Sequence, residues 1–164
     1  MRSTEENEAF SAFYRRHADF VYGIALSFLR VPADAEDAAA DVFLKILETD
    51  MQFEDDAHAR AWLTVAVRNR CKNLLKSWVH TRRTELDQVS EPAGEPTDSR
   101  LNETMSALYG LPERYRLPLL LFAVQGFTVT ETAEILKLKE STVRTRIQRA
   151  RKLLRKALER RDDP

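Results

Sequence analysis

One stretch near the C-terminus is dense in side chains that can donate hydrogen bonds and neutralise charge. Rotation by about 100° per residue places these side chains on one face of a predicted helix. They are Ser141, Thr145, Gln148, Arg149, Lys152 and Lys156, with Arg144 and Arg146 on the flanks. Hydroxyls, an amide and arginine can hydrogen-bond the edges of DNA bases, and the later lysines can neutralise phosphates. The pattern favours a major-groove helix over a merely solvated amphipathic helix.

The elements around this face predict a helix-turn-helix. An apolar stripe on the other side of the helix faces a core, and it consists of Val143, Ile147, Ala150, Leu154 and Leu158. Upstream, Thr128 and Glu131 have the spacing of a capping box, which starts a short helix that ends near Leu136. Ala133 is small enough for a close helix approach, and Leu138 is expected to plug the core from the turn.

A second group of polar side chains lies in residues 61–83, which hold six basic residues and no acidic one. Arg68, Lys72 and Lys76 are four residues apart and form a ridge suited to the phosphates of a nucleic-acid strand. Asn69 and Asn73 flank this ridge, and amides can read the Watson–Crick edge of an unstacked base. Nearby hydrophobic residues are expected to lie in the core rather than to stack on bases or sense redox state; these are Trp62, Cys71 and Trp78.

Charge alternates along the chain although the formal net charge is zero. The balance is −7 over residues 1–60, +6 over 61–83, −6 over 84–113 and +7 over 114–164. Local fields govern phosphate binding, so neutrality of the whole chain does not exclude a nucleic-acid partner. The alternative is that both basic blocks are ordinary solvated helix faces.

The 164 residues divide into two small all-α domains. A linker is predicted at residues 85–100, where two prolines, a glycine and five acidic residues leave little apolar surface to bury. The first domain, residues 1–84, shows helical periodicity in three stretches, with Asp34 expected to cap the second and a polar loop at 49–56. The second domain, residues 101–164, begins with a helix near 102–109. Pro112 then opens a helix that runs to about 125 and ends at Gly126.

Other function classes find little support. Cys71 is the only cysteine, and His17, His58 and His80 lie far apart without a metal-ligand spacing, so no metal and no cofactor is expected. No paired carboxylates, activated nucleophile or phosphate loop indicates an enzyme. No apolar run is long enough to cross a membrane and no signal peptide is visible, which places the protein in the cytoplasm.

Both halves resemble one family, the bacterial sigma factors of the extracytoplasmic-function group. The C-terminal half resembles their region 4 at Leu111, Pro112, Arg116, Leu120, Gly126, Glu131, Ala133, Leu136, Thr142, Val143, Arg146, Arg149, Ala150, Arg151 and Leu154. The N-terminal half resembles region 2 at Asp34, Ala35, Glu36, Asp37, Asp41, Phe43, Leu44, Lys45, Trp62, Leu63, Arg68 and Asn69. The resemblance spans essentially the whole chain, including the linker.

The resemblance implies that the protein binds core RNA polymerase and promoter DNA under the control of an anti-sigma factor. The minus-thirty-five element would be read by Ser141, Thr142, Arg144, Thr145, Gln148, Arg149 and Lys152. The minus-ten element would be bound by Arg68, Asn69, Lys72, Asn73 and Lys76, with a loop near Asn69 that takes a flipped base. Core polymerase would be gripped by Asp37, Asp41, Phe43 and Lys45.

Three positions depart from the family pattern. Ala40 replaces a frequent glutamine, so one polar contact to polymerase is missing. Lys137 replaces a turn glycine; because a left-handed lysine costs roughly 1–2 kcal/mol, the turn is expected to take another shape. Lys139 replaces a capping serine, which leaves the recognition helix without a side-chain cap and open to a DNA phosphate.

Two other functions fit parts of the sequence. A helix-turn-helix regulator with a separate sensor domain explains the C-terminal half but not the region 2 residues. A sigma mimic that only titrates an anti-sigma factor does not explain the intact basic ridge and recognition helix.

Overall fold

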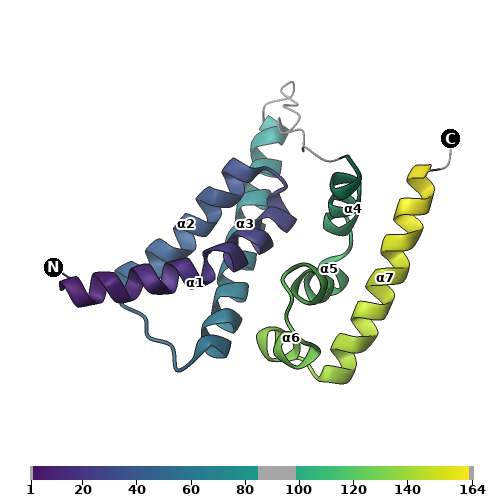
Figure 1. The fold of residues 1–164 in the computed structure, drawn as a ribbon. Coiled ribbons are helices and arrows are strands. Elements are labelled where there is room, and N and C mark those ends of the chain that lie inside the picture. Colours follow the sequence, from purple (N-terminus) through teal and green to yellow (C-terminus); the bar gives the residue numbers. More distant parts are fainter. Residues whose placement is uncertain (1, 85–98, 163–164) are drawn as a thin grey trace. The chain divides into compact units, whose positions relative to one another are not determined.

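The computed structural model describes residues 2–84 and 99–162, and within these residues every regular element is helical. The predicted all-α class is confirmed (Figure 1). The chain divides into two compact units, residues 1–93 and 94–164, and each has its own core. Among the described residues, no helix combines the length and apolar character needed to span a membrane.

The N-terminal unit consists of three helices that all contact one another: α1 (Thr4–Leu29), α2 (Pro32–Thr49) and α3 (Asp56–Thr84). Fully buried aliphatic and small side chains from all three form the core, among them Val21, Ile24, Ala25, Ala35, Ala38, Leu63, Val67 and Cys71. Cys71 is a buried free thiol, as the sequence predicted. A bundle of three helices with one shared core fixes the outer faces of α2 and α3, which carry the candidate site residues.

The ends of the first two helices follow local chemistry. Ser3 and Glu6 exchange hydrogen bonds at 2.9 and 3.1 Å in a capping box that starts α1. The prediction that Asp34 caps α2 is wrong, because the cap residue is Val31 and Pro32 occupies the first helical position. Proline suits this position since its fixed φ is helical and its missing N–H has no partner there. Asp34 lies in the first turn, where its charge favours the helix dipole.

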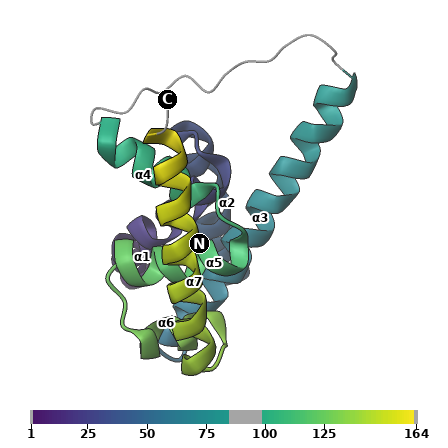
Figure 2. The ribbon, with the colours of Figure 1, turned by 90° about the vertical axis from the view of Figure 1, so that its right-hand side faces the viewer.

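Helix α3 is continuous from Asp56 to Thr84, and Figure 2 shows its C-terminal half running past α1 and α2. The expectation of a loop near Asn69 is therefore wrong, since Asn69 lies in the middle of this helix. No glycine or proline interrupts residues 56–84, so the local sequence gives the backbone no reason to break. The loop of this unit that borders α3 is residues 50–55, upstream of the basic ridge.

The C-terminal unit contains α4 (Ser99–Tyr109), α5 (Glu113–Leu119), a π-helical turn η1 (Leu120–Val124), α6 (Val129–Leu136) and α7 (Glu140–Asp162). Helix α4 begins at Ser99, so the last two residues assigned to the linker are helical; residues 85–98 lie outside the described chain. Helix α7 contacts α4, α5 and α6, which makes it the central element of the unit.

The helix predicted from Pro112 to about residue 125 exists in a modified form. Pro112 is the residue that caps α5, and the last turn widens into η1. Pro118 lies inside α5 and has no N–H to donate to the preceding turn, a common cause of locally altered helix bonding. Gly126 follows with φ of 79°, the left-handed conformation predicted for the helix end.

Candidate nucleic-acid interface

The helix-turn-helix starts with the predicted capping box. The Glu131 amide donates to the Thr128 hydroxyl at 3.0 Å, and the Thr128 amide donates to the Glu131 carboxylate at 3.1 Å. Both bonds satisfy amides that the first turn of α6 would otherwise leave without partners. Ala133 is buried and Leu138 is half-buried, as expected for the close contact and the plug.

Lys137 occupies the turn with φ of 55° and ψ of 48°. The expectation of a different turn shape is wrong, because this lysine adopts the left-handed conformation itself. The amide of Leu138 donates to the Ala133 carbonyl at 3.0 Å, which closes the end of α6 in the manner of a glycine-terminated helix. The helix-turn-helix therefore keeps the backbone shape that a turn glycine would give, and Lys137 bears the strain of the left-handed conformation.

The two faces of α7 are separated as the periodicity predicted. Val143, Ile147 and Ala150 are at most 4% exposed and hold the helix against the unit. Six of the seven residues assigned to the minus-thirty-five element are exposed on other faces: Ser141, Arg144, Thr145, Gln148, Arg149 and Lys152. Thr142 is half-buried. The buried side holds the helix in place, while its exposed sides carry an amide, hydroxyls and cations. These groups have the chemistry needed to bind a major groove.

Glu140 places a carboxylate at the N-terminus of α7, next to the predicted DNA-binding face. The Thr130 hydroxyl of α6 donates to Glu140 at 2.8 Å, and Arg144 lies 3.5 Å from the other carboxylate oxygen. Glu140 therefore ties the first helix of the motif to the start of the second, and its charge favours the positive end of the helix dipole. The feature of the sequence that could have predicted this role is the glutamate two residues after Leu138 in the turn.

Not every cation in the C-terminal unit is available for DNA. Arg116 is 9% exposed and donates to the Leu111 carbonyl at 2.9 Å, so it holds the turn between α4 and α5. The Arg151 guanidinium lies 5.5 Å from the centroid of the Phe122 ring, and Arg161 donates to the Glu103 carbonyl at 3.1 Å. Arg116 therefore serves the fold rather than a ligand, whereas Arg151 and Arg161 are exposed and each also has a partner within the unit.

Tyr115 of α5 contacts Arg149, the arginine assigned to a base edge. Hydrogen bonds from Arg114 and then from Arg149 lower the pKa of the Tyr115 hydroxyl below its usual value. The Arg114 guanidinium also lies 4.8 Å from the centroid of the Tyr115 ring. Tyr115 could not be predicted from the sequence, because nothing in its spacing relates α5 to the middle of α7.

On α3 the assigned minus-ten residues share one side of the helix. Asn69, Asn73 and Lys76 are exposed, and Arg68 and Lys72 are partly buried. The buried side is formed by Leu63, Val67 and Cys71, in agreement with the helical spacing. Trp62 is half-buried with its ring 5.6 Å from that of Phe53, and Trp78 is also half-buried.

The residues assigned to polymerase binding fall into two classes. Asp37, Asp41 and Lys45 are exposed on α2. Phe43 is only 3% exposed, and its ring lies 4.9 Å from that of Tyr14 and 6.2 Å from that of Phe13. Phe43 is therefore a core residue rather than a surface contact, and the exposed apolar side chain of this helix is Leu44, at 50% exposure.

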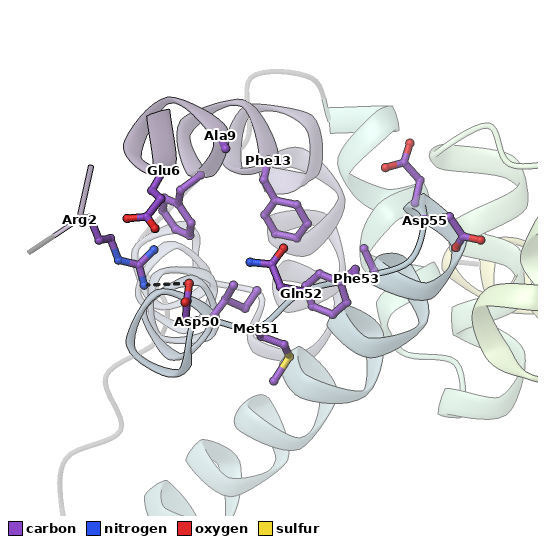
Figure 3. A pocket seen from close by; sticks show the side chains of 13 residues that line it. Arg2, Glu6, Ala9, Phe13, Asp50, Met51, Gln52, Phe53 and Asp55 are labelled. Carbon is purple, nitrogen blue, oxygen red and sulfur yellow. Dashed lines mark ion pairs between the residues drawn. The ribbon is translucent and has the colours of Figure 1, made fainter. Parts of the chain in front are cut away.

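A cavity of about 330 Å³ lies where the N-terminus of α1 meets the loop between α2 and α3 (Figure 3). Its aromatic wall includes Phe10, Phe13 and Phe53, and the last two rings stack 5.5 Å apart. Its rim carries one arginine, Arg2, against the acids Glu6, Asp50, Asp55 and Asp56. An acidic rim repels a phosphate backbone, so the basic side of α3 is the stronger candidate for DNA.

Two families of known sequences match the chain. Sigma-70 region 2 matches residues 13–81, and Sigma-70 region 4 matches residues 101–154. Together they cover more than two thirds of the chain. One similar protein is an ECF RNA polymerase sigma factor, SigM of Mycobacterium tuberculosis, which is 29% identical over 92% of this chain and 77% of its own length. The chain belongs to the extracytoplasmic-function group of sigma-70 factors.

Solved structures agree with this assignment. The sigma factor RpoE of Bartonella quintana, in complex with the anti-sigma factor NepR, has the same fold with a TM-score of 0.70 and 20% identity over 93% of this chain and 98% of its own. CnrH, in complex with the cytosolic domain of CnrY, gives 0.68 and 26% identity over 96% and 91%. The sigma factor described here thus combines region 2 in its N-terminal unit with region 4 in its C-terminal unit.

Proposed function

We propose that this sigma factor binds core RNA polymerase through α2, the minus-ten element through α3 and the minus-thirty-five element through α7. The observation that carries the proposal is the separation of faces on α7. Val143, Ile147 and Ala150 are buried, while Gln148, Arg149 and four further polar residues are presented to solvent. The protein would act as a specificity subunit in the cytoplasm, without catalysis or a cofactor of its own.

For the minus-thirty-five element, Gln148 and Arg149 are the proposed base readers. Arg144 and Lys152 contact phosphates on either side, and Ser141, Thr142 and Thr145 contribute hydroxyl contacts near the start of the helix. Arginine pairs with two acceptors of guanine, and glutamine with adenine, which gives these two side chains their discriminating power. The phosphate contacts set the register of the helix without reading sequence.

Sequencing of the duplexes that the holoenzyme retains from a randomised pool tests this assignment. Arg149→Ala should cost about 1–3 kcal/mol in binding to the preferred sequence and relax preference at one position. The matched control is Arg155→Ala, an exposed arginine on the same helix with no assigned contact. If both substitutions leave the retained sequences unchanged, α7 does not read DNA.

For the minus-ten element, Arg68, Lys72 and Lys76 are proposed to follow the backbone of one strand. Asn69 and Asn73 lie beside them with donors and acceptors that suit an unstacked base. Asn69→Ala should therefore slow promoter opening and leave closed-complex affinity nearly unchanged, as measured by permanganate footprinting beside filter binding. Equal loss in both measurements would assign Asn69 to general DNA affinity instead.

For core polymerase, Asp37, Asp41 and Lys45 supply the proposed polar contacts of α2. Leu44 takes the apolar role that the resemblance gave to Phe43, because Leu44 is exposed and Phe43 is not. The acidic surface of this helix suits a basic partner surface. An exposed leucine beside charged groups is the usual composition of an interface centre with a polar rim.

Regulation by an anti-sigma factor is proposed from the likeness to the RpoE–NepR complex. Binding partners captured with the tagged sigma factor from the source cells would be tested for competition with core polymerase. A partner that displaces the sigma factor from core supports the proposal. If none of the captured partners reduces binding of the sigma factor to core polymerase, the proposed regulation is contradicted.

A further inference from the structure

Asp41 of α2 forms an ion pair with Arg70 of α3 in the free protein. The Arg70 Nε atom of α3 donates to Asp41 Oδ2 at 2.9 Å, and the two side chains are 43% and 44% exposed. The pair joins the helix proposed to bind polymerase to the helix proposed to bind the minus-ten element. The two helices lie side by side in the N-terminal unit (Figure 1).

Arg70 lies within the stretch of α3 that holds the minus-ten candidates, yet neither the ridge nor its flanks include it. On a helix, Arg70 is about 60° from Asn73 and about 100° from Asn69. It therefore borders the asparagine flank of the surface, on the opposite side from Arg68. The Arg70 side chain is long, so its guanidinium could reach a phosphate next to that flank once it is no longer bound to Asp41.

The pair is suited to exchange partners. Half-exposed ion pairs are screened by water and contribute little net stability, so a competing charge can replace either member. A basic polymerase surface would compete for Asp41, and a DNA phosphate would compete for Arg70. Polymerase binding to Asp41 would release Arg70, and DNA binding to Arg70 would release Asp41. Each binding event therefore favours the other.

We propose that Arg70 is a further DNA-contacting residue that Asp41 holds away from DNA until core polymerase engages Asp41. This inference rests on the proposed polymerase contact of α2. It makes the pair a checkpoint that lowers DNA affinity in the free sigma factor and raises it in the holoenzyme.

The first test uses the free protein and a fluorescent single-stranded oligonucleotide of mixed sequence, titrated over a range of salt. Asp41→Asn should bind several-fold more tightly, and the slope of log affinity against log salt should steepen by about 0.7 for one added phosphate contact. Arg70→Gln alone should show no such gain. Asp41→Asn combined with Arg70→Gln should lose the gain.

Glu48→Gln is the matched control, since Glu48 lies two turns from Asp41 on the same face of α2 and is exposed. It removes one negative charge without releasing an arginine, so the salt slope should not change. The inference is overturned if Asp41→Asn gains no more affinity than Glu48→Gln, or if the gain survives in the double variant. Matching thermal unfolding of the Asp41→Asn and Arg70→Gln variants shows whether loss of the pair alone alters the fold.

A second arm separates this inference from the proposed function. Holoenzyme assembled with Arg70→Gln should bind promoter DNA several-fold more weakly than wild-type holoenzyme while still producing a specific transcript. Wild-type DNA affinity together with a specific transcript overturns the role of Arg70 and leaves the sigma function intact. Absence of any specific transcript from the wild-type holoenzyme is instead a failure of the proposed function.

Discussion

The Oδ1 atom of Asp56 lies 3.7 Å from the Nε2 atom of His17, where the first residue of α3 meets the buried side of α1. Arg16 donates to both oxygens of the same carboxylate at 3.0 and 3.1 Å. Burial lowers the pKa of His17, the Asp56 charge opposes this, and Arg60 and Arg16 add to the lowering. Because the pKa falls below the usual 6.5, His17 is neutral at pH 7.

This relationship predicts a specific acid sensitivity. The unfolded chain binds a proton at His17 near pH 6.5 and the folded chain only at lower pH, so His17 contributes stability above pH 6.5 that is lost as the pH falls. Between pH 7.5 and 5.5 the loss from this one group is at most about 1.4 kcal/mol. His17→Gln should reduce the pH dependence of the free energy of unfolding, measured with denaturant at both pH values.

His80→Gln is the control for this measurement, because His80 is an exposed histidine on α3. This variant should reduce the difference between the two pH values less than His17→Gln does, because His80 is not buried. Equal pH dependence in the His17→Gln variant and the wild type would show that burial of His17 does not control its protonation.

The left-handed turn residue Lys137 predicts a stabilising substitution. Glycine adopts φ of 55° without the clash that a Cβ causes, so Lys137→Gly should raise the free energy of unfolding by about 0.5–1 kcal/mol after its entropy cost. Lys139→Gly removes the same charge at a residue without positive φ and should be neutral or destabilising. A lower midpoint of denaturant unfolding for Lys137→Gly would contradict the strained geometry of the turn.

The contact between Tyr115 and Arg149 predicts a titration that reports on the recognition helix. Arg114→Ala should raise the pKa of Tyr115 most and Arg149→Ala should raise it less, following the order of their effects on the hydroxyl. Ultraviolet absorbance of the phenolate, with Tyr115→Phe to assign the signal, measures both. Arg155→Ala is expected to leave the titration unchanged. An unchanged Tyr115 pKa in the Arg149→Ala variant would contradict the contact between these two side chains.

The exposed leucine of α2 predicts a loss of polymerase affinity. Leu44→Ala should weaken binding of core polymerase by about 1 kcal/mol, roughly fivefold, because less apolar area is buried in the complex. Val65→Ala removes a similarly exposed apolar side chain from α3 and should have a smaller effect. Fluorescence anisotropy of labelled sigma factor titrated with core measures both. An equal effect of the two substitutions would argue against a contact centred on Leu44.

Periodicity and capping chemistry predicted much of the fold. The capping box at Thr128, the buried stripe from Val143 to Ala150 and the helix end at Gly126 depend on local rules, and the structure has all three. The prediction that Asp34 caps α2 is wrong because Pro32 occupies the first helical position and starts the helix two residues earlier. The π-helical turn after Pro118 departs from regular helical periodicity, so the spacing of apolar residues did not indicate it.

The candidate site was only partly predictable. Exposure of the α7 residues follows from the buried stripe on the same helix, which is a local property. Burial of Phe43 against Tyr14, the pairing of Asp41 with Arg70 and the contact of Tyr115 with Arg149 each join different helices. Sequence spacing carries no information on such contacts, so it predicts neither the burial of Phe43, which the resemblance assigns to polymerase binding, nor the two pairs.

Promoter-directed transcription is the decisive test of the proposed promoter recognition by α3 and α7. Core RNA polymerase with this sigma factor would be incubated with fragmented DNA of the source genome, and the 5′ ends of the transcripts would be sequenced. We expect start sites that share a minus-thirty-five and a minus-ten element, and we expect Arg149→Ala to change only the first element. Transcripts that start without a shared element, or at the same sites without the sigma factor, would contradict the proposed recognition.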